Sequence, residues 1–351
     1  MIYRILLFLL LACCADAGLL IGNPRIITTP DKTYAQTMQS VITPWFEKGH
    51  QGTFTGTEGV PIRYGVFRAA EPTGAVILLT GYSQNIDLLR EVIYDLNRGG
   101  LHVYAYDHRG HGGSGRILQD TEKVWVCRFT NYVDDLDLFI STIVQPDYDG
   151  PLYGLAHSMG GLVLASYLSS RPDHPLQAAV LSAPMLEINT GDISKSTAWL
   201  LANTVGRIPW LNRNYAPGVG PFNPDSTFTE NASHNNRPRW EWEQQWRRDN
   251  PAKRNGGATF GWVKEALNHS NKLRKSHAAE RIGIPVLILQ AENDAYVSPA
   301  GQNEFCNTAR DCRLVSFTGY TPAAGHEIYN EGDHVRQAWL DEVLNFIGSH
   351  P

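Results

Sequence analysis

The sequence predicts an α/β fold: a mainly parallel, doubly wound sheet with helices on both faces and a helical segment inserted late in the chain. Over the first half, short apolar runs alternate with helical patterns, which is typical of parallel strands joined by crossover helices. Between residues 185 and 280 no run is typical of a buried strand, and strand-like runs resume at Ile284. With 351 residues, of which 42% are hydrophobic and 19% charged, the chain can bury a large core.

The N-terminus has the pattern of an export signal. Arg4 precedes an apolar run over residues 5–12, which is far shorter than the roughly 20 residues needed to span a membrane. Two processing sites stay open. Ala-Asp-Ala at 15–17 would give a soluble mature chain, whereas Leu-Leu-Ala-Cys ending at Cys13 resembles a bacterial lipobox that would leave the cysteine acylated. An uncleaved anchor is a third alternative. We therefore expect an exported protein that is periplasmic, secreted or membrane-associated.

Sequence patterns place the elements after this signal in turn. The apolar run at 75–80 is typical of a parallel strand buried on both faces. Residues 89–96 then carry apolar side chains at helical spacing, and Gly99 ends that helix. By the same reasoning we expect strands at 53–57, 61–67, 75–80, 102–106, 152–156, 178–182, 284–290 and 314–317, and helices at 89–96, 133–143, 162–168, 239–248, 259–267 and 333–347. The predicted organisation is a signal (1–17), an N-terminal arm (18–51), an α/β core (52–184 and 281–351) and a helical lid (185–280).

One strand–turn–helix stretch carries a candidate nucleophile. Ser158 lies between an apolar run that ends at Ala156 and a helical pattern that begins after Gly160. Small residues two before and two after a serine allow the sharp turn that exposes its hydroxyl above a sheet. Here the pattern is A-x-S-x-G, since alanine replaces the usual first glycine. The alternative is that Ser158 is only the N-cap of an ordinary helix.

Two later loops supply a candidate acid and a candidate base. Asp294 follows the strand predicted at 284–290, and His326 follows the last predicted strand, with Gly325 allowing close approach. The order Ser, Asp, His is that of hydrolases with a serine on such a turn. His326 would take the serine proton, and Asp294 would orient the imidazole. Glu292 is the alternative acid.

Two backbone amides are expected to form an oxyanion hole. Met159 offers one at the start of the helix after the nucleophile, and Tyr82 offers the other just after the strand at 75–80. His108 and His111 could indicate a metal site, but no third ligand has fitting spacing, and packing of their loop is the better interpretation. No metal or other cofactor is therefore predicted.

Charge and cysteine content limit the remaining possibilities. The formal net charge of −5 gives no indication of nucleic-acid binding. In an oxidising compartment Cys306 and Cys312 are close enough in sequence to form a disulfide, and the alternative is that Cys127, Cys306 and Cys312 are separate thiols. The predicted lid is rich in tryptophan, which suits either its own core or the wall of a pocket for a partly apolar substrate.

Several motifs resemble the α/β-hydrolase family, in its branch of monoacylglycerol lipases and bacterial lysophospholipases. Residues 106–116 resemble the D-x-R-G-x-G-x-S-G loop of that branch, and residues 129–136 resemble its F-x-x-Y-V-x-D-L helix start. Three further stretches are most similar to bacterial lysophospholipases described as membrane-associated: 182–185, 256–263 and 289–292. The resemblance covers the chain from about Thr53 to its end.

This resemblance implies an α/β-hydrolase fold and a serine hydrolase that cleaves the acyl ester of lysophospholipids or monoacylglycerols through an acyl-enzyme. It implies Ser158, Asp294 and His326 as the catalytic residues. The sequence departs from the branch at Ala156 and at Thr80, where the branch frequently has glycine and histidine. The expected partner is a lipid-like small molecule, together with peripheral or lipid-anchored membrane contact. The alternatives are a general carboxylesterase and a non-catalytic lipid-binding protein on the same scaffold.

Overall fold

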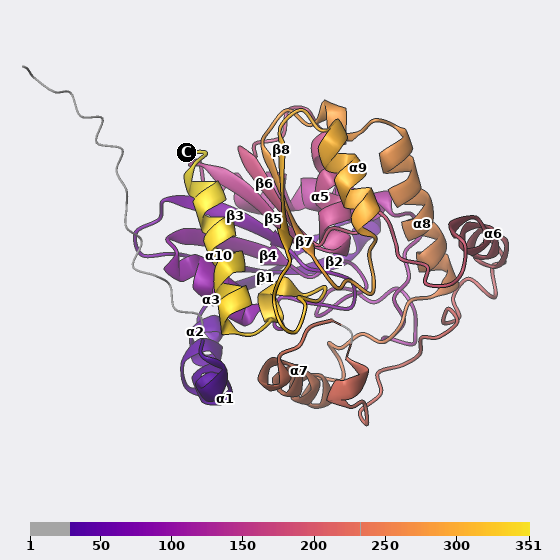
Figure 1. Cartoon of the computed structure of the whole chain (residues 1–351), viewed down its shortest axis with the longest axis horizontal. Coiled ribbons are helices and arrows are strands. Elements are labelled where there is room, and N and C mark those ends of the chain that lie inside the picture. Colours follow the sequence, from indigo (N-terminus) through magenta and orange to yellow (C-terminus); the bar gives the residue numbers. More distant parts are fainter. Residues whose placement is uncertain (1–28, 232) are drawn as a thin grey trace, which may run out of the picture.

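An eight-stranded sheet forms the centre of the molecule, in the order β1-β2-β4-β3-β5-β6-β7-β8 (Figure 1). The computed structural model of the chain describes residues 29–231 and 233–351, so the predicted signal lies outside the described residues. The strands are β1 (His50–Thr55), β2 (Pro61–Phe67), β3 (Gly74–Leu79), β4 (Leu101–Tyr106), β5 (Leu152–His157), β6 (Ala178–Ser182), β7 (Val286–Ala291) and β8 (Cys312–Phe317).

The strand directions confirm the predicted fold class. β1 pairs with β2 and β2 pairs with β4 in antiparallel fashion, whereas every pairing from β4 to β8 is parallel. β1 begins and ends earlier than predicted, because its register with β2 runs from His50 opposite Val66 to Thr55 opposite Pro61. Thr57, the last residue predicted for that strand, belongs instead to a short 3-10 turn over residues 57–59.

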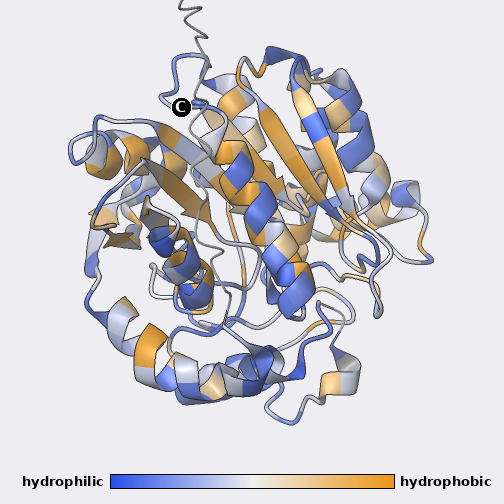
Figure 2. Cartoon of the chain, turned by 60° about the vertical axis from the view of Figure 1, so that its left-hand side comes forward, coloured by the Kyte–Doolittle hydropathy of each residue, from blue (hydrophilic) through white to orange (hydrophobic). Residues whose placement is uncertain are grey.

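Helices cover both faces of the sheet because alternate strand residues point to opposite sides. On β3, Val76 and Leu78 pack in one core cluster, whereas Ala75, Ile77 and Leu79 pack in the other. The first cluster contains α3 (Arg90–Arg98) and α10 (Asp333–Gly348); the second contains α4 (Thr130–Phe139), the π-helix η4 (Ile140–Val144), α5 (Met159–Ser170) and α9 (Pro299–Thr308). Figure 2 shows the apolar strands between helices whose outer faces are hydrophilic.

Three longer helices lie between β6 and β7 in the sequence (Figure 1), and the last of them adds Trp262, Ala266 and Leu273 to the second core cluster. They are α6 (Lys195–Val205), α7 (Arg237–Asp249) and α8 (Phe260–Lys275). The sequence patterns predicted α7 and the first half of α8 but no helix at α6, where Leu200 and Leu201 are exposed and no one-sided apolar pattern results. Within the described residues, no helix combines the length and the apolar character needed to cross a membrane.

The segment before β1 is helical and packs against α7. It comprises η1 (Asp31–Thr33), α1 (Tyr34–Thr37), η2 (Met38–Ile42) and α2 (Thr43–Glu47). Tyr34, Met38 and Ile42 form a small buried cluster against Trp242 of α7. The remaining short helices are η3 (Thr57–Gly59), η5 (Phe228–Glu230), η6 (Ala279–Arg281) and η7 (Ile328–Asn330).

A disulfide joins the end of α9 to the start of β8. It links Cys306 to Cys312, whose Cα atoms are 5.3 Å apart. Of the two alternatives that the sequence left open, the bridge is therefore the one found. Cys127 is a free, exposed thiol.

Candidate active site

Ser158 lies on the tight turn between β5 and α5. Its φ of 51° and ψ of −114° are unfavourable for a residue with a side chain. The turn is fixed by hydrogen bonds, because Ser158 N donates to Ser182 O at 3.0 Å and Ser158 O accepts from Met185 N at 2.9 Å. Gly160 is needed beside it, since a Cβ at that position would lie 2.6 Å from Thr80 O. Ala156, in contrast, is accommodated without exposed surface.

The three residues predicted from separate loops meet in one hydrogen-bonded chain. His326 Nε2 lies 2.8 Å from Ser158 Oγ, and His326 Nδ1 lies 2.7 Å from Asp294 Oδ2. Ser158 and His326 are 6% and 5% exposed, and the Asp294 side chain is 4% exposed. Because a carboxylate can only accept, Nδ1 carries a hydrogen and the neutral ring presents Nε2 as an acceptor to the serine hydroxyl.

The surroundings of the two candidate acids differ. Asp294 Oδ1 accepts hydrogen bonds from the backbone N–H groups of Tyr296 and Val297, each at 2.9 Å, which leaves Oδ2 directed at His326. Glu292 is exposed and accepts from Gly319 N at 3.1 Å. The structure thus brings Asp294, and not Glu292, into hydrogen-bond contact with His326.

The loop that carries Tyr82 approaches the serine closely. A Cβ on Gly81 would lie 3.3 Å from Ser158 Cβ and 2.8 Å from His157 Cδ2, so only glycine fits there. None of the hydrogen bonds described for residues 29–231 and 233–351 uses the N–H of Tyr82 or Met159. The oxyanion hole stays a prediction, and both amides are free to serve it.

Several residues near the triad were not predicted from the sequence. Gln84 Oε1 accepts from Gly81 N at 2.9 Å, while Gln84 Nε2 donates to Glu327 Oε1 at 2.9 Å and to Tyr329 OH at 2.6 Å. This amide connects the Tyr82 loop to the loop of His326. His157 packs 4.7 Å from the His326 ring, and burial holds the pKa of His157 well below its usual range. No motif marks these residues, because their contacts join remote parts of the chain.

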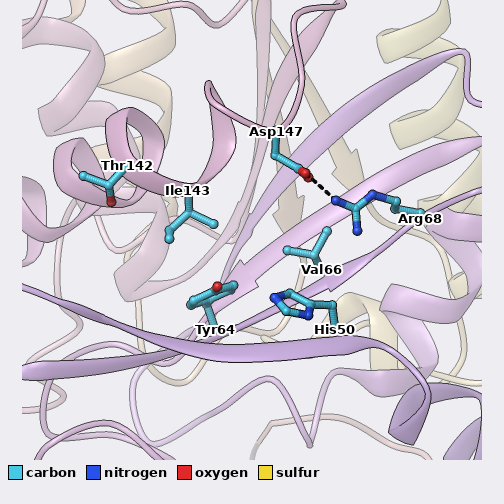
Figure 3. Close-up of a pocket in the computed structure, with 7 residues that line it drawn as sticks. All are labelled: His50, Tyr64, Val66, Arg68, Thr142, Ile143 and Asp147. Carbon is cyan, nitrogen blue, oxygen red and sulfur yellow. Dashed lines mark hydrogen bonds and ion pairs between the residues drawn. The ribbon is translucent and has the colours of Figure 1, made fainter.

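A cavity of about 650 Å³ opens onto Ser158 and His326. One part of its lining is apolar and includes Met185, Ile188, Val219, Trp262 and Val297. Another part is polar and includes His234, Glu243, Arg247 and Glu327. A separate cavity of about 280 Å³ lies against the sheet edge at β1 and β2, where Arg68 pairs with Asp147 (Figure 3). No triad residue lines that second cavity.

His108 and His111 are packed within their loop. His108 Nε2 contacts Thr80 O at 3.2 Å, and His111 Nδ1 contacts Arg109 O at 3.0 Å. Burial lowers the pKa of His108 to about 3 and that of His111 to about 4, so both rings are neutral at pH 7. These contacts agree with the packing interpretation.

Comparison with known proteins places this geometry in a family. The family model described as serine aminopeptidase, S33, matches residues 70–333. Lysophospholipase L2 of Escherichia coli (strain K12) is 31% identical over 326 residues, which cover 92% of this chain and 94% of that protein. Monoacylglycerol lipase of Mycolicibacterium smegmatis is 26% identical over 301 residues, covering 85% of this chain and 96% of that protein.

A solved structure has the same fold. It is a soluble variant of monoglyceride lipase from Saccharomyces cerevisiae in complex with a substrate analogue, with a TM-score of 0.67 and 16% identity. The match covers 86% of this chain and 97% of that chain. Together with the parallel sheet and the family match over most of the sequence, these findings identify the chain as a member of the serine aminopeptidase S33 family of α/β-hydrolases.

Proposed function

We propose that this carboxylic ester hydrolase cleaves the single acyl ester of lysophospholipids or monoacylglycerols through an acyl-enzyme on Ser158. The observation that carries the proposal is the hydrogen-bonded chain from Ser158 Oγ through His326 to Asp294 Oδ2. A serine hydroxyl is a weak nucleophile unless a neighbouring base can accept its proton, and the unprotonated Nε2 of His326 is such a base.

The proposed reaction has two proton-coupled steps. Ser158 Oγ attacks the ester carbonyl while His326 Nε2 takes the hydroxyl proton, and the oxyanion is held by the N–H groups of Tyr82 and Met159. The intermediate collapses, the C–O bond to the alcohol breaks, and His326 returns the proton to the departing alcohol. Water then attacks the acyl carbonyl while His326 takes its proton. The bond from the carbonyl carbon to Ser158 Oγ breaks, His326 returns the proton to Oγ, and the fatty acid leaves.

Two observations support a lipid substrate. The apolar lining of the cavity can hold an acyl chain beside Ser158, since burial of each methylene contributes about 0.8 kcal/mol. The relatives named above are a lysophospholipase and a monoacylglycerol lipase, and both match over more than four fifths of this chain. We also propose that the protein is exported and acts at a membrane surface, since lysophospholipids are found there.

Fatty-acid release from a matched panel tests the proposal. The panel contains lysophosphatidylethanolamine, lysophosphatidylcholine and a monoacylglycerol with one common acyl chain, and short p-nitrophenyl esters. We expect release from the lipids by the wild type and none by Ser158→Ala. Turnover of the p-nitrophenyl esters alone would mean a general carboxylesterase, and lipid binding with no turnover would mean a non-catalytic protein.

A further inference from the structure

Two glutamates and a histidine meet at the polar end of the active-site cavity. One ligand-type atom from each of His234, Glu243 and Glu327 lies within 4.8 Å of the other two. Glu327 directly follows His326 in the sequence, and all three residues line the cavity that contains Ser158. The cluster therefore stands where the alcohol portion of an ester bound at Ser158 can reach it.

The protein itself leaves part of this cluster without partners. Arg247 donates from Nε and Nη2 to Oε1 of Glu243, at 2.9 and 2.7 Å, and no hydrogen bond within residues 29–231 and 233–351 reaches Oε2. Burial and the charge of Glu243 raise the pKa of Glu327 to about 8. Although Arg247 already pairs with Glu243, a second carboxylate charge stays disfavoured here until a further positive charge arrives.

His234 adds an independent sign of a ligand. It is 4% exposed, and its Nδ1 accepts a hydrogen bond from Asn236 N at 3.2 Å. Burial lowers the pKa of His234 to about 4, so the ring is neutral and its hydrogen is on Nε2. Among the described residues no acceptor is hydrogen-bonded to that Nε2–H. A donor of this kind at a cavity wall indicates a ligand that brings an acceptor.

These contacts fit an organic zwitterion better than a metal ion. With Nδ1 occupied and Nε2 protonated, His234 has no free lone pair for a metal. Both oxygens of Glu327 already accept amide hydrogens, from Gln84 Nε2 at 2.9 Å and Asn330 Nδ2 at 2.7 Å. A primary ammonium needs only the remaining lone pairs of the carboxylates, and its N–H groups make charge-assisted hydrogen bonds to them.

We propose that His234, Glu243 and Glu327 form a headgroup subsite that selects a phosphodiester bearing a primary ammonium. The ammonium donates to the carboxylates of Glu243 and Glu327, and a phosphate oxygen accepts from His234 Nε2–H. The substrate class is therefore lysophospholipids of the phosphoethanolamine type. This inference rests on the proposed function, because the headgroup is part of the ester that Ser158 would cleave.

Binding of soluble headgroups tests the subsite without any turnover. The dissociation constants of the wild-type chain are measured by titration calorimetry for glycerophosphoethanolamine, glycerophosphocholine and glycerophosphoglycerol. We expect glycerophosphoethanolamine to bind about 10-fold more tightly than glycerophosphoglycerol, which lacks the amine. Glycerophosphocholine, whose cation has no N–H donor, should bind more weakly than glycerophosphoethanolamine. Equal constants for all three in the wild type would overturn the proposal.

Two variants and a matched control test whether the headgroup preference comes from the two cavity glutamates. Glu327→Gln and Glu243→Gln should each reduce the 10-fold preference to less than about 3-fold. The second variant is included because Glu243 also holds Arg247, and the melting temperature of each variant verifies that it folds. Glu241→Gln is the control, since that exposed glutamate lies on α7 and pairs with Arg237. If the preference for glycerophosphoethanolamine survives in both cavity variants, the headgroup subsite is contradicted. It is also contradicted if the wild type binds Zn²⁺ or Ca²⁺ and both variants abolish that binding.

The same variants separate this inference from the proposed function. The ratio of kcat/KM for lysophosphatidylethanolamine to that for a monoacylglycerol with the same acyl chain should fall about 10-fold in Glu327→Gln. A headgroup preference without hydrolysis of either lipid would reject the proposed function alone. Hydrolysis of both lipids with an unchanged ratio would reject the headgroup subsite alone.

Discussion

At the scale of single residues, Asp294 and Glu292 are only two positions apart, but their contacts and their exposure differ. Asp294 is held by two backbone N–H groups and contacts His326, whereas Glu292 is exposed. The sequence pattern favoured Asp294 but left Glu292 open, because both acids follow the same strand. Only the direction of the loop after β7 separates them.

Replacing the acid should impair turnover far more than binding. Without a carboxylate at Asp294→Asn, the hydrogen on Nδ1 of His326 is no longer favoured, so Nε2 no longer accepts from Ser158. We expect kcat for a p-nitrophenyl ester to fall by about 10³-fold or more. Glu292→Gln is the matched control and should change kcat less than about twofold. Equal losses in the two variants would argue against Asp294 as the acid.

Residue types that carry a motif were predictable, and those that act through tertiary contacts were not. Ser158, Asp294 and His326 each follow a predicted strand, so their loops were expected at one edge of the sheet. Gln84, Glu243 and Glu327 carry no such signal. Gln84 and Glu327 are 243 positions apart, and their hydrogen bond depends on the order of strands in the sheet, which local patterns do not encode.

At the scale of elements, the start of α5 limits what the nucleophile turn tolerates. A Cβ on Gly160 would lie 2.6 Å from Thr80 O and 2.9 Å from Leu79 Cβ, and backbone atoms cannot give way as a flexible side chain can. We expect Gly160→Ala to lower the free energy of unfolding by about 1–3 kcal/mol and to reduce kcat by displacing Ser158. Denaturant unfolding and ester hydrolysis measure both effects.

Gly283→Ala is the control for that variant. No atom lies within 4 Å of a Cβ built at Gly283, which precedes β7. Its stability should change by less than about 0.5 kcal/mol, and kcat should not change. If Gly160→Ala were equally well tolerated, the close approach of α5 to the end of β3 would not matter for the turn.

Long apolar patterns on one face of a helix predicted elements well, whereas helices with exposed apolar residues were not predicted. The predicted helix at 333–347 corresponds to α10 (Asp333–Gly348), whose apolar residues pack on the sheet. In contrast, α6 exposes Trp199, Leu200 and Leu201, so its apolar residues do not mark one buried face. The helix predicted at 133–143 is found as α4 and its extension at Ile140–Val144, and only the π geometry of that extension has no local signal.

At the scale of the whole molecule, buried neutral histidines couple stability to pH. Burial lowers the pKa of four histidines, two of them in one loop, to between about 3 and about 4: His108, His111, His234 and His269. In the unfolded chain these side chains titrate near 6.5. Their full contribution to stability is present above pH 6.5 and is lost as the pH falls toward their folded pKa values.

Among the described residues, five acids act in the opposite direction because their pKa is raised in the folded chain: Asp95, Asp107, Glu327, Glu331 and Asp333. The pKa of Glu327 is raised to about 8 and that of Asp95 to about 6, both chiefly by burial, so folding binds their protons more tightly. We expect the free energy of unfolding to fall as the pH is lowered from 6.5 to 5, because seven described histidines have a lowered pKa and outnumber these five acids.

A single variant isolates the histidine contribution. His269→Gln should make the dependence of stability on pH shallower by about 1 kcal/mol per pH unit, averaged between pH 6.5 and 5. Urea unfolding at several pH values gives both slopes. His277→Gln is the control, since that side chain is exposed and pairs with Glu280 at the surface. Identical slopes in wild type and His269→Gln would show that His269 is not held neutral by the fold.

The central claim is that Ser158 is an activated nucleophile, and covalent labelling tests it most directly. The full chain is treated with a fluorophosphonate that reacts with activated serines, and the site of the adduct is determined by peptide mass spectrometry. We predict one adduct, on Ser158, which is absent in Ser158→Ala and forms at least about 10²-fold more slowly in His326→Ala. An adduct on another serine, or ester hydrolysis that persists in Ser158→Ala, would contradict the account.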